Sequence, residues 1–242
     1  NINNALLCLL SLILLFAPLF IQNKFAITLP SGLEITIYFF IFAAEILGEI
    51  NNFYGIIPYW DTILHTINGF LAAAVGFSLI DLLNKNSKNV NLSPFYLCLV
   101  AFCFSMTIGV LWEFFECAMD QFFFLDMQKD TVVKKISSVT LNPSGKNKAI
   151  VVSSIGKTVI YDENGYILET IDGGYLDIGL NDTMKDLLVN FIGVVVFCSF
   201  AYLALKQNKK NNFIDKFIPT KEKRPMASSV IKEIEDRKEL VK

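Results

Sequence analysis

The chain has 242 residues, of which 53% are hydrophobic and 18% are charged, and its mean hydropathy is +0.48. This balance is more apolar than that of soluble domains and indicates a membrane protein. The formal net charge of -2 and the isoelectric point near 5.5 do not favour nucleic-acid binding. We therefore expect membrane lipids, and no nucleic acid, among its partners.

Five apolar segments approach the roughly 20 residues that a membrane helix needs. The first, "NALLCLLSLILLFAPLFIQ", has no basic start and no small-residue cleavage site, so it is interpreted as a span and not as a signal peptide. We predict an all-α polytopic membrane protein of about five transmembrane helices, four within residues 1–120 and one within 182–206. The five segments are residues 4–22, 33–49, 62–83, 94–117 and 184–205.

Residues 121–181 form an insert that is too long to be a bare connection between two spans. Its segments "KAIVVSS" and "KTVIYDENGYILETI" are typical of short strands, and Asn164-Gly165 is a hairpin turn signal. We predict a compact, small β-rich element that packs over the outer mouth of the helices.

The lysines near the ends of the spans predict the orientation of the chain, because positive residues concentrate in cytoplasmic loops. Residues 50–61, between the second and third spans, carry none. We therefore expect the N-terminus outside, the insert extracytoplasmic and a cytoplasmic charged tail at 207–242. The lysines that carry this prediction are Lys24, Lys85, Lys88, Lys206, Lys209 and Lys210.

Polar residues recur at helical spacing in three of the spans, so each set lies along one side of its helix. The alternating direction of the spans brings all three sets to one membrane face, which the lysines make the outer face. Ionisable groups inside a span are costly unless they are paired or face the bundle interior. We predict a shared polar cup that opens outward. Its three sets are Asp61, His65 and Asn68; Glu113, Glu116 and Asp120; and Asp182, Asp186 and Asn190.

The cup residues suit two kinds of role. His65, the sole histidine, serves either as a general base or as a structural hydrogen-bonding group. Asp61, Asp120 and Asp182 lie near span ends, where a solvated interface position is the alternative. The helical spacing turns Lys185 away, so a phosphate ligand would need a metal. We expect catalytic roles for His65, Glu113 and Asp186, substrate binding by Asp61, Glu116, Asn190 and Asp182, and metal binding by Glu113, Glu116 and Asp186.

Three ordered blocks, "DTILHTINGF", "GVLWEFFECAMDQF" and "DTMKDLLVNFIGVVV", resemble the VanZ-like membrane proteins, named for a teicoplanin-resistance protein. The likeness is greater to uncharacterised bacterial relatives with W-E-x-x-E in the second block. Asp61 and His65 match the D-x-x-x-H block, and Glu116 stands where many VanZ-like sequences have Gln. The resemblance implies a small multi-pass protein of the bacterial plasma membrane but supplies no settled reaction.

Two functions remain open from the sequence. In the first, a divalent metal in the cup binds or acts on a lipid headgroup or a lipid-linked envelope precursor. In the second, the protein is a non-catalytic interaction or antibiotic-resistance and peptide-resistance protein whose carboxylates form a structural network. A transporter is disfavoured, because the chain shows no internal repeat.

Overall fold

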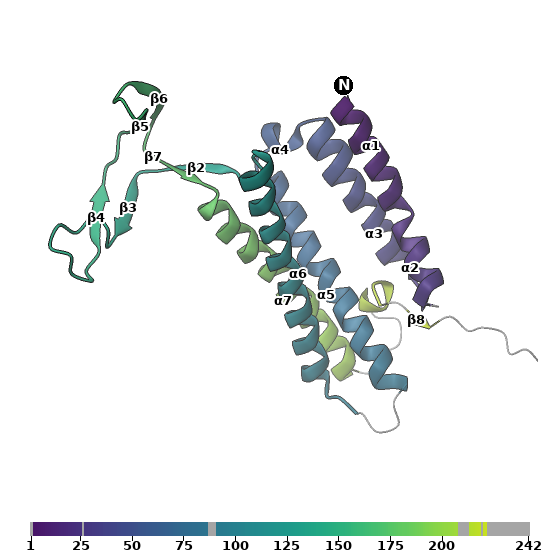
Figure 1. The fold of residues 1–242 in the computed structure, drawn as a ribbon. Helices are drawn as coiled ribbons and strands as arrows, with labels where there is room; N and C mark the ends of the chain where they lie inside the picture. The colour runs from purple at the N-terminus through teal and green to yellow at the C-terminus, as the bar shows by residue number, and fades with distance from the viewer. Residues whose placement is uncertain (1, 26, 87–90, 208–212, 219, 222–242) are drawn as a thin grey trace, which may run out of the picture.

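The structure is a computed structural model that describes residues 2–25, 27–86, 91–207, 213–218 and 220–221. Most of the tail predicted at 207–242 lies outside these residues, as do Lys88, Lys209 and Lys210. The described chain is mostly helical, with a small β-strand region that projects from one end of the helices (Figure 1).

The N-terminal apolar segments form shorter helices than the sequence predicts. A turn at Phe16 separates α1 from α2, because Pro18 has no backbone N–H to continue the helical hydrogen bonds. The second predicted span begins as an α-helix and continues as a π-helix, η1. These elements are α1 (Ile2–Leu15), α2 (Ala17–Phe25), α3 (Ser31–Ile41), η1 (Phe42–Ile50) and α4 (Phe53–Ile56).

Three long helices form the main bundle: α5 (Trp60–Asn86), α6 (Pro94–Phe123) and α7 (Leu180–Gln207). Among the described residues, only these three are long and apolar enough to cross a membrane. A shorter apolar helical stretch, Ser11–Lys24, lies outside that set. The structure therefore supports a helical membrane protein but does not confirm the count of five spans.

Small residues allow the three helices to approach closely. A Cβ added to Gly69 would overlap the backbone of Asn190, and one added to Gly193 would overlap the carbonyl oxygen of Thr66. Ser105 Oγ donates a hydrogen bond to the carbonyl oxygen of Gly69 at 2.8 Å. These contacts are the packing role expected for small residues between membrane helices, and they bring the polar faces of the helices together.

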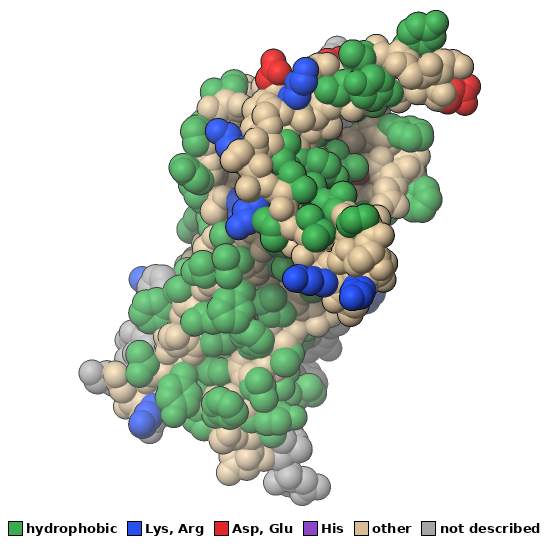
Figure 2. Space-filling model, turned by 90° about the vertical axis from the view of Figure 1, so that its left-hand side faces the viewer, with side chains coloured by type: hydrophobic (Ala, Val, Ile, Leu, Met, Phe, Trp, Pro, Cys, Tyr) green, Lys and Arg blue, Asp and Glu red, His purple; other side chains and the backbone are tan. Residues whose placement is uncertain are grey.

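Apolar side chains cover much of the outside of the bundle (Figure 2). Leu83, Phe114 and Leu188 are each exposed on it. A surface of this kind is unfavourable in water and suits contact with lipid tails. The charged groups within the helices are instead mostly turned inward, which sets up the site described below.

The β region is an open arm and not the compact cap that the sequence predicts. It consists of three separate two-stranded antiparallel ladders, and most of its side chains are exposed (Figure 1). Strands of this length in isolated pairs cannot bury an apolar core of their own. The ladders are β2 (Asp130–Val133) with β7 (Tyr175–Ile178), β3 (Lys135–Ser138) with β4 (Ile150–Ser153), and β5 (Lys157–Tyr161) with β6 (Ile167–Asp172).

The predicted Asn164-Gly165 turn lies between β5 and β6, where Gly165 has a positive φ of 87°. Glycine adopts this left-handed conformation without steric cost. Near the other end of the bundle, β1 (Ile27–Thr28) pairs with β8 (Thr220–Lys221), preceded by the short helix η2 (Phe213–Lys216).

Candidate functional site

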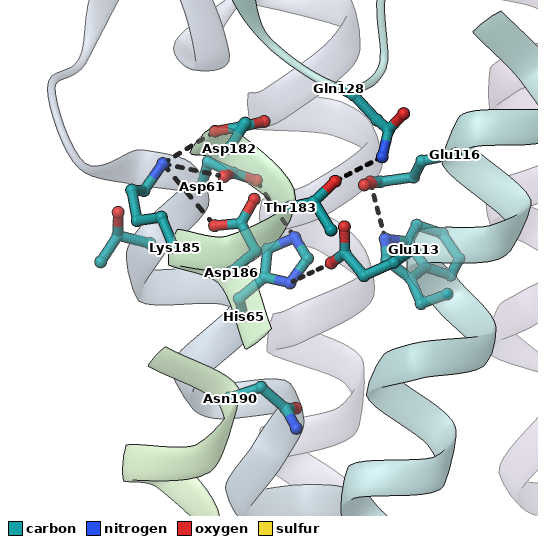
Figure 3. Close-up of polar contacts among 12 residues, drawn as sticks. Asp61, His65, Glu113, Glu116, Gln128, Asp182, Thr183, Lys185, Asp186 and Asn190 are labelled. Carbon is teal, nitrogen blue, oxygen red and sulfur yellow. Dashed lines mark hydrogen bonds and ion pairs between the residues drawn. The ribbon is translucent and has the colours of Figure 1, made fainter. Parts of the chain in front are cut away.

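Residues from all three predicted polar sets meet at one end of the bundle (Figure 3). This end is formed by the beginnings of α5 and α7 and the last turns of α6, because α6 runs opposite to the other two helices. Within this cluster, Glu113, Glu116, Asp182, Asp186 and Asn190 are buried.

His65 lies between carboxylates from two helices. Its Nε2 atom is 3.4 Å from Asp61 Oδ1, one turn away on α5. Its Nδ1 atom is 3.9 Å from Glu113 Oε1 on α6. Both edges of the imidazole therefore face an acid, and the side chain is largely shielded from solvent.

Glu116 lies one turn beyond Glu113 and accepts a hydrogen bond from Trp112 Nε1 at 2.7 Å. The indole N–H satisfies one carboxylate oxygen at this buried position. Trp112 is thus tied to the site through its polar atom while much of its ring surface stays exposed.

Lys185 also belongs to the site, and the prediction that helical spacing turns it away is wrong. Its Nζ atom lies 3.0 Å from Asp182 Oδ1, 3.6 Å from Asp186 Oδ1 and 3.7 Å from Asp61 Oδ2. A long lysine stem reaches over a neighbouring turn although its Cα faces elsewhere. The spacing of Asp182 and Lys185, three residues apart, is the sequence signal that could have placed it.

Asp120 and Asp182 hold the chain segment that leaves α6. Asp120 accepts hydrogen bonds from the backbone N–H groups of Met127 at 2.6 Å and Gln128 at 2.8 Å. Asp182 Oδ2 accepts one from the backbone N–H of Lys129 at 2.7 Å. These two acids act as anchors for the rim of the site, in addition to any role in binding.

The site contains two groups of side chains whose potential ligand atoms lie within 4.8 Å of one another. One group is His65, Glu113 and Glu116, and the other is Asp61, His65 and Asp186. The trio predicted to bind metal, Glu113, Glu116 and Asp186, is therefore divided between two groups that share the imidazole. Imidazole nitrogen and carboxylate oxygen together suit a first-row divalent cation such as Mn²⁺ or Zn²⁺.

Several buried oxygen atoms have no hydrogen-bond partner among the described residues, including Glu113 Oε2, Asp186 Oδ1 and Asn190 Oδ1. Leaving such an atom unpaired in the interior is costly, and the cost is larger for a charged group. Asp186 Oδ1 has Lys185 Nζ nearby, whereas Glu113 Oε2 has neither a hydrogen-bond partner nor a lysine or arginine beside it among the described residues. Among the acids of these two groups, Glu113 therefore has the strongest need for a cationic ligand.

Asn190 lies one turn deeper than Asp186 and stands apart from both groups (Figure 3). Its Nδ2 atom is 3.6 Å from Met106 Sδ, and Gly109 leaves space for its amide. The structure thus gives Asn190 a position at the floor of the site, below the carboxylates predicted to share its role.

The comparison with protein families identifies the chain. Residues 2–207 match the model of a family described as "Predicted membrane protein (DUF2238)". The chain belongs to this family. Neither the curated proteins nor the solved structures include a match to it.

A cleft of about 330 Å³ adjoins the site, and no sequence motif predicts it. Burial raises the pKa of Tyr54 far above its ordinary value, and the charges of Asp61 and of the glutamates on η1 add to this effect. Tyr54 therefore keeps its proton and can donate a hydrogen bond. A single tyrosine in the four-residue helix α4 has no spacing pattern that would single it out. The cleft is lined by Gly48, Glu49, Asn52, Tyr54, Gly55, Asp126 and Lys129.

Proposed function

We propose that this membrane protein binds a divalent cation through His65, Glu113 and Glu116, and that the cation holds a phosphate group of a lipid or lipid-linked envelope precursor. The observation that carries this proposal is the buried Glu113, 4% exposed, whose Oε2 atom has no hydrogen-bond partner within the described chain. A cation beside it would satisfy that oxygen and offset the charge of Glu116.

The position of Lys185 indicates which of the two groups of side chains can hold the cation. It already places a positive charge within 4 Å of Asp61, Asp182 and Asp186. A second cation there would be repelled by the ammonium group. The group on the other side of the imidazole has no lysine or arginine partner among the described residues, so we assign the cation to it.

The position of Asp61 supports the same assignment. With Nδ1 of His65 directed at the cation, Nε2 faces Asp61 Oδ1 at 3.4 Å. A carboxylate on the far edge of a metal-binding histidine fixes the orientation of the ring and raises its basicity. In this arrangement His65 is a metal ligand and not a general base.

The cleft supports a phosphate-bearing ligand. Its volume of about 330 Å³ is within the range of small-molecule sites. Tyr54 and Lys129 line it and supply a hydroxyl donor and an ammonium group. Lys129 is held by Asp126, with Nζ 3.4 Å from Oδ2. A phosphate in the cleft would meet the hydroxyl group of Tyr54 and the ammonium group of Lys129.

We also propose that the protein is related to the VanZ-like family and lies in a bacterial plasma membrane, with the site on the outer face and the C-terminus in the cytoplasm. The ordered blocks around His65, Glu113 and Asp186 support the relationship. Lys85 and Lys206 support the orientation, since both are in the last turns of helices that begin at the site. Labelling of single cysteines placed near Gly145 from outside intact cells would test it.

A second candidate is a non-catalytic interaction or antibiotic-resistance protein in which the acids form a fixed network. The contacts of Lys185 with three carboxylates, and the anchoring of Lys129 by Asp182, favour this alternative. It predicts that the acids are required for folding whether or not a cation is present.

Calorimetric titration of the detergent-purified protein with Mn²⁺ tests the proposal. We expect Glu113→Gln to abolish cation binding while the protein remains helical and monodisperse. Asp81→Asn is the matched control, because Asp81 is buried and paired with Lys85 at the opposite end of α5. Mn²⁺ should then increase the binding of a short-chain phosphatidylglycerol by the wild type but not by Glu113→Gln. No Mn²⁺ binding by the wild type, combined with unfolding of Glu113→Gln, would support the fixed network instead.

A further inference from the structure

The arm separates positive and negative charge along its sequence. Residues 131–161 contain five lysines and no acid, whereas residues 162–178 contain five acids and no lysine or arginine. The first part includes the hairpin of β3 and β4, residues 134–154, which we call the basic hairpin. The second part includes most of the hairpin of β5 and β6, residues 157–172, which we call the acidic hairpin.

The two hairpins point in opposite directions from the β2–β7 ladder. In Figure 1 the basic hairpin turns back toward the level of the helices, and the acidic hairpin points away from them. In Figure 2 red side chains lie toward the top of the arm, where blue is also present, and only blue ones continue into its lower part. The lysines of the basic hairpin form no ion pair with any described residue, so their charge remains available.

Exposed apolar side chains accompany these lysines. Val139 and Leu141 lie in the loop of the basic hairpin, and each is 43% exposed. Val151, on β4, is 54% exposed. Lysines interspersed with exposed aliphatic residues are the combination that binds at the headgroup level of a membrane.

The base of the arm is fixed to the bundle, which holds the basic hairpin on one side. Gln128 Nε2 donates a hydrogen bond to Thr183 Oγ1 at 2.5 Å. The backbone N–H of Lys129 donates to Asp182 at 2.7 Å. Both contacts lie immediately before β2 and join it to the first turn of α7, so the direction of the arm is set at the end of the bundle where the membrane surface must lie.

We propose that the basic hairpin docks on the surface of the membrane that the bundle crosses and binds the anionic headgroups of phospholipids. Charge complementarity selects an anionic surface, and the direction of the hairpin brings the lysines toward it. The acidic hairpin projects into water, where it is not repelled by the headgroups. This inference does not depend on the cation site. The lysines that carry it are Lys134, Lys135, Lys146 and Lys148.

Hydrogen–deuterium exchange of the full chain in lipid nanodiscs tests the proposal. We expect amides 134–154 to exchange several-fold more slowly in discs of equal phosphatidylcholine and phosphatidylglycerol than in discs of phosphatidylcholine alone. Amides of the acidic hairpin should exchange equally in both. High salt should remove the difference, because the attraction is screened.

Two matched variants identify the charges responsible. Replacing the four lysines of the basic hairpin by Gln should abolish the lipid-dependent slowing. Replacing four acids of the acidic hairpin by their amides, Asp162→Asn, Glu163→Gln, Glu169→Gln and Asp172→Asn, should preserve it. Equal exchange of the wild type in both lipids would overturn the proposal. Slowing that requires two copies of the chain in each disc would also overturn it, because a second copy would then be the occupant. Mn²⁺ titration of the same samples separates this result from that of the cation site.

Discussion

The bundle and the arm place their charges in opposite ways. At the end of the bundle, one histidine and one lysine each lie within 4 Å of at least two acids, and most of these side chains are buried. Along the arm, most lysines and acids are exposed, and most of the lysines lie in a different hairpin from most of the acids. A charge within a membrane helix needs a partner or a ligand, whereas a charge in water does not. This difference is the reason why we propose ligand binding for the bundle and surface recognition for the arm.

The largest effect should come from Gly193→Ala, which tests whether close helix contact maintains the site. The added Cβ would overlap the carbonyl oxygen of Thr66, and backbone cannot move aside cheaply. We expect a loss of about 3 kcal/mol or more in the free energy of unfolding, measured by denaturation in detergent. In the arm, a Cβ on Gly156 would meet nothing within 4 Å, so Gly156→Ala should change stability by less than about 0.5 kcal/mol. Similar losses in both variants would contradict the contrast.

The next effect concerns the support of the imidazole. Asp61→Asn should lower Mn²⁺ affinity by about ten- to a hundred-fold, as is typical when the partner of a metal-binding histidine is weakened. Calorimetry gives the affinity, and circular dichroism should show an unchanged helical content. Asp182→Asn keeps an oxygen for the N–H of Lys129 and should leave Mn²⁺ affinity nearly unchanged. Equal losses in both variants would show that general negative charge, and not orientation of His65, determines binding.

A smaller effect should follow from removing the lysine of the network. Lys185→Met leaves Asp61, Asp182 and Asp186 without their nearby cation. Since the lysine side chain is 46% exposed, solvent screening limits the expected loss of stability to about 1 kcal/mol. Thermal unfolding measures this loss, and Lys185→Arg should restore most of it. An unchanged melting temperature in Lys185→Met would show that these ion pairs do not stabilise the bundle.

The smallest effect on the bundle should come from shortening the arm. Val133 and Tyr175 are direct partners in the β2–β7 ladder, so a two-residue Asn-Gly turn can replace residues 134–174. The melting temperature and the Mn²⁺ affinity should stay close to those of the full chain. A clear decrease in either would mean that the hairpins support the bundle, contrary to the division proposed here.

The same contrast explains what the sequence could predict. The polar faces of α5, α6 and α7 follow from helical spacing alone, because Asp61 and His65, Glu113 and Glu116, and Asp182 and Asp186 recur at three or four residues. The direction of the helices then places them at one end. Hairpin strands around Asn164 and Gly165 were predicted from turn chemistry in the same local way.

Features that depend on tertiary context were harder to predict. The helical position of Lys185 predicts that it points away from the site, but its long side chain reaches back over the helix to the acids. The hydropathy of the first apolar segment gives no sign of the helix break near Pro18 that divides this segment into two helices. We predicted a compact arm because strand patterns in a sequence do not show whether hairpins stack on one another. Tyr54 carries no local pattern, and only the fold places it beside Asp61.

Electron spin echo spectroscopy of bound Mn²⁺ tests the central claim most directly. The chain has one histidine, so any directly coordinated imidazole nitrogen must come from His65. With the protein purified without a histidine tag, we predict the modulation of a coordinated ¹⁴N nucleus in the wild type and its loss in His65→Gln. Bound Mn²⁺ with no nitrogen modulation in the wild type, or the same modulation in His65→Gln, would contradict a cation held by His65, Glu113 and Glu116.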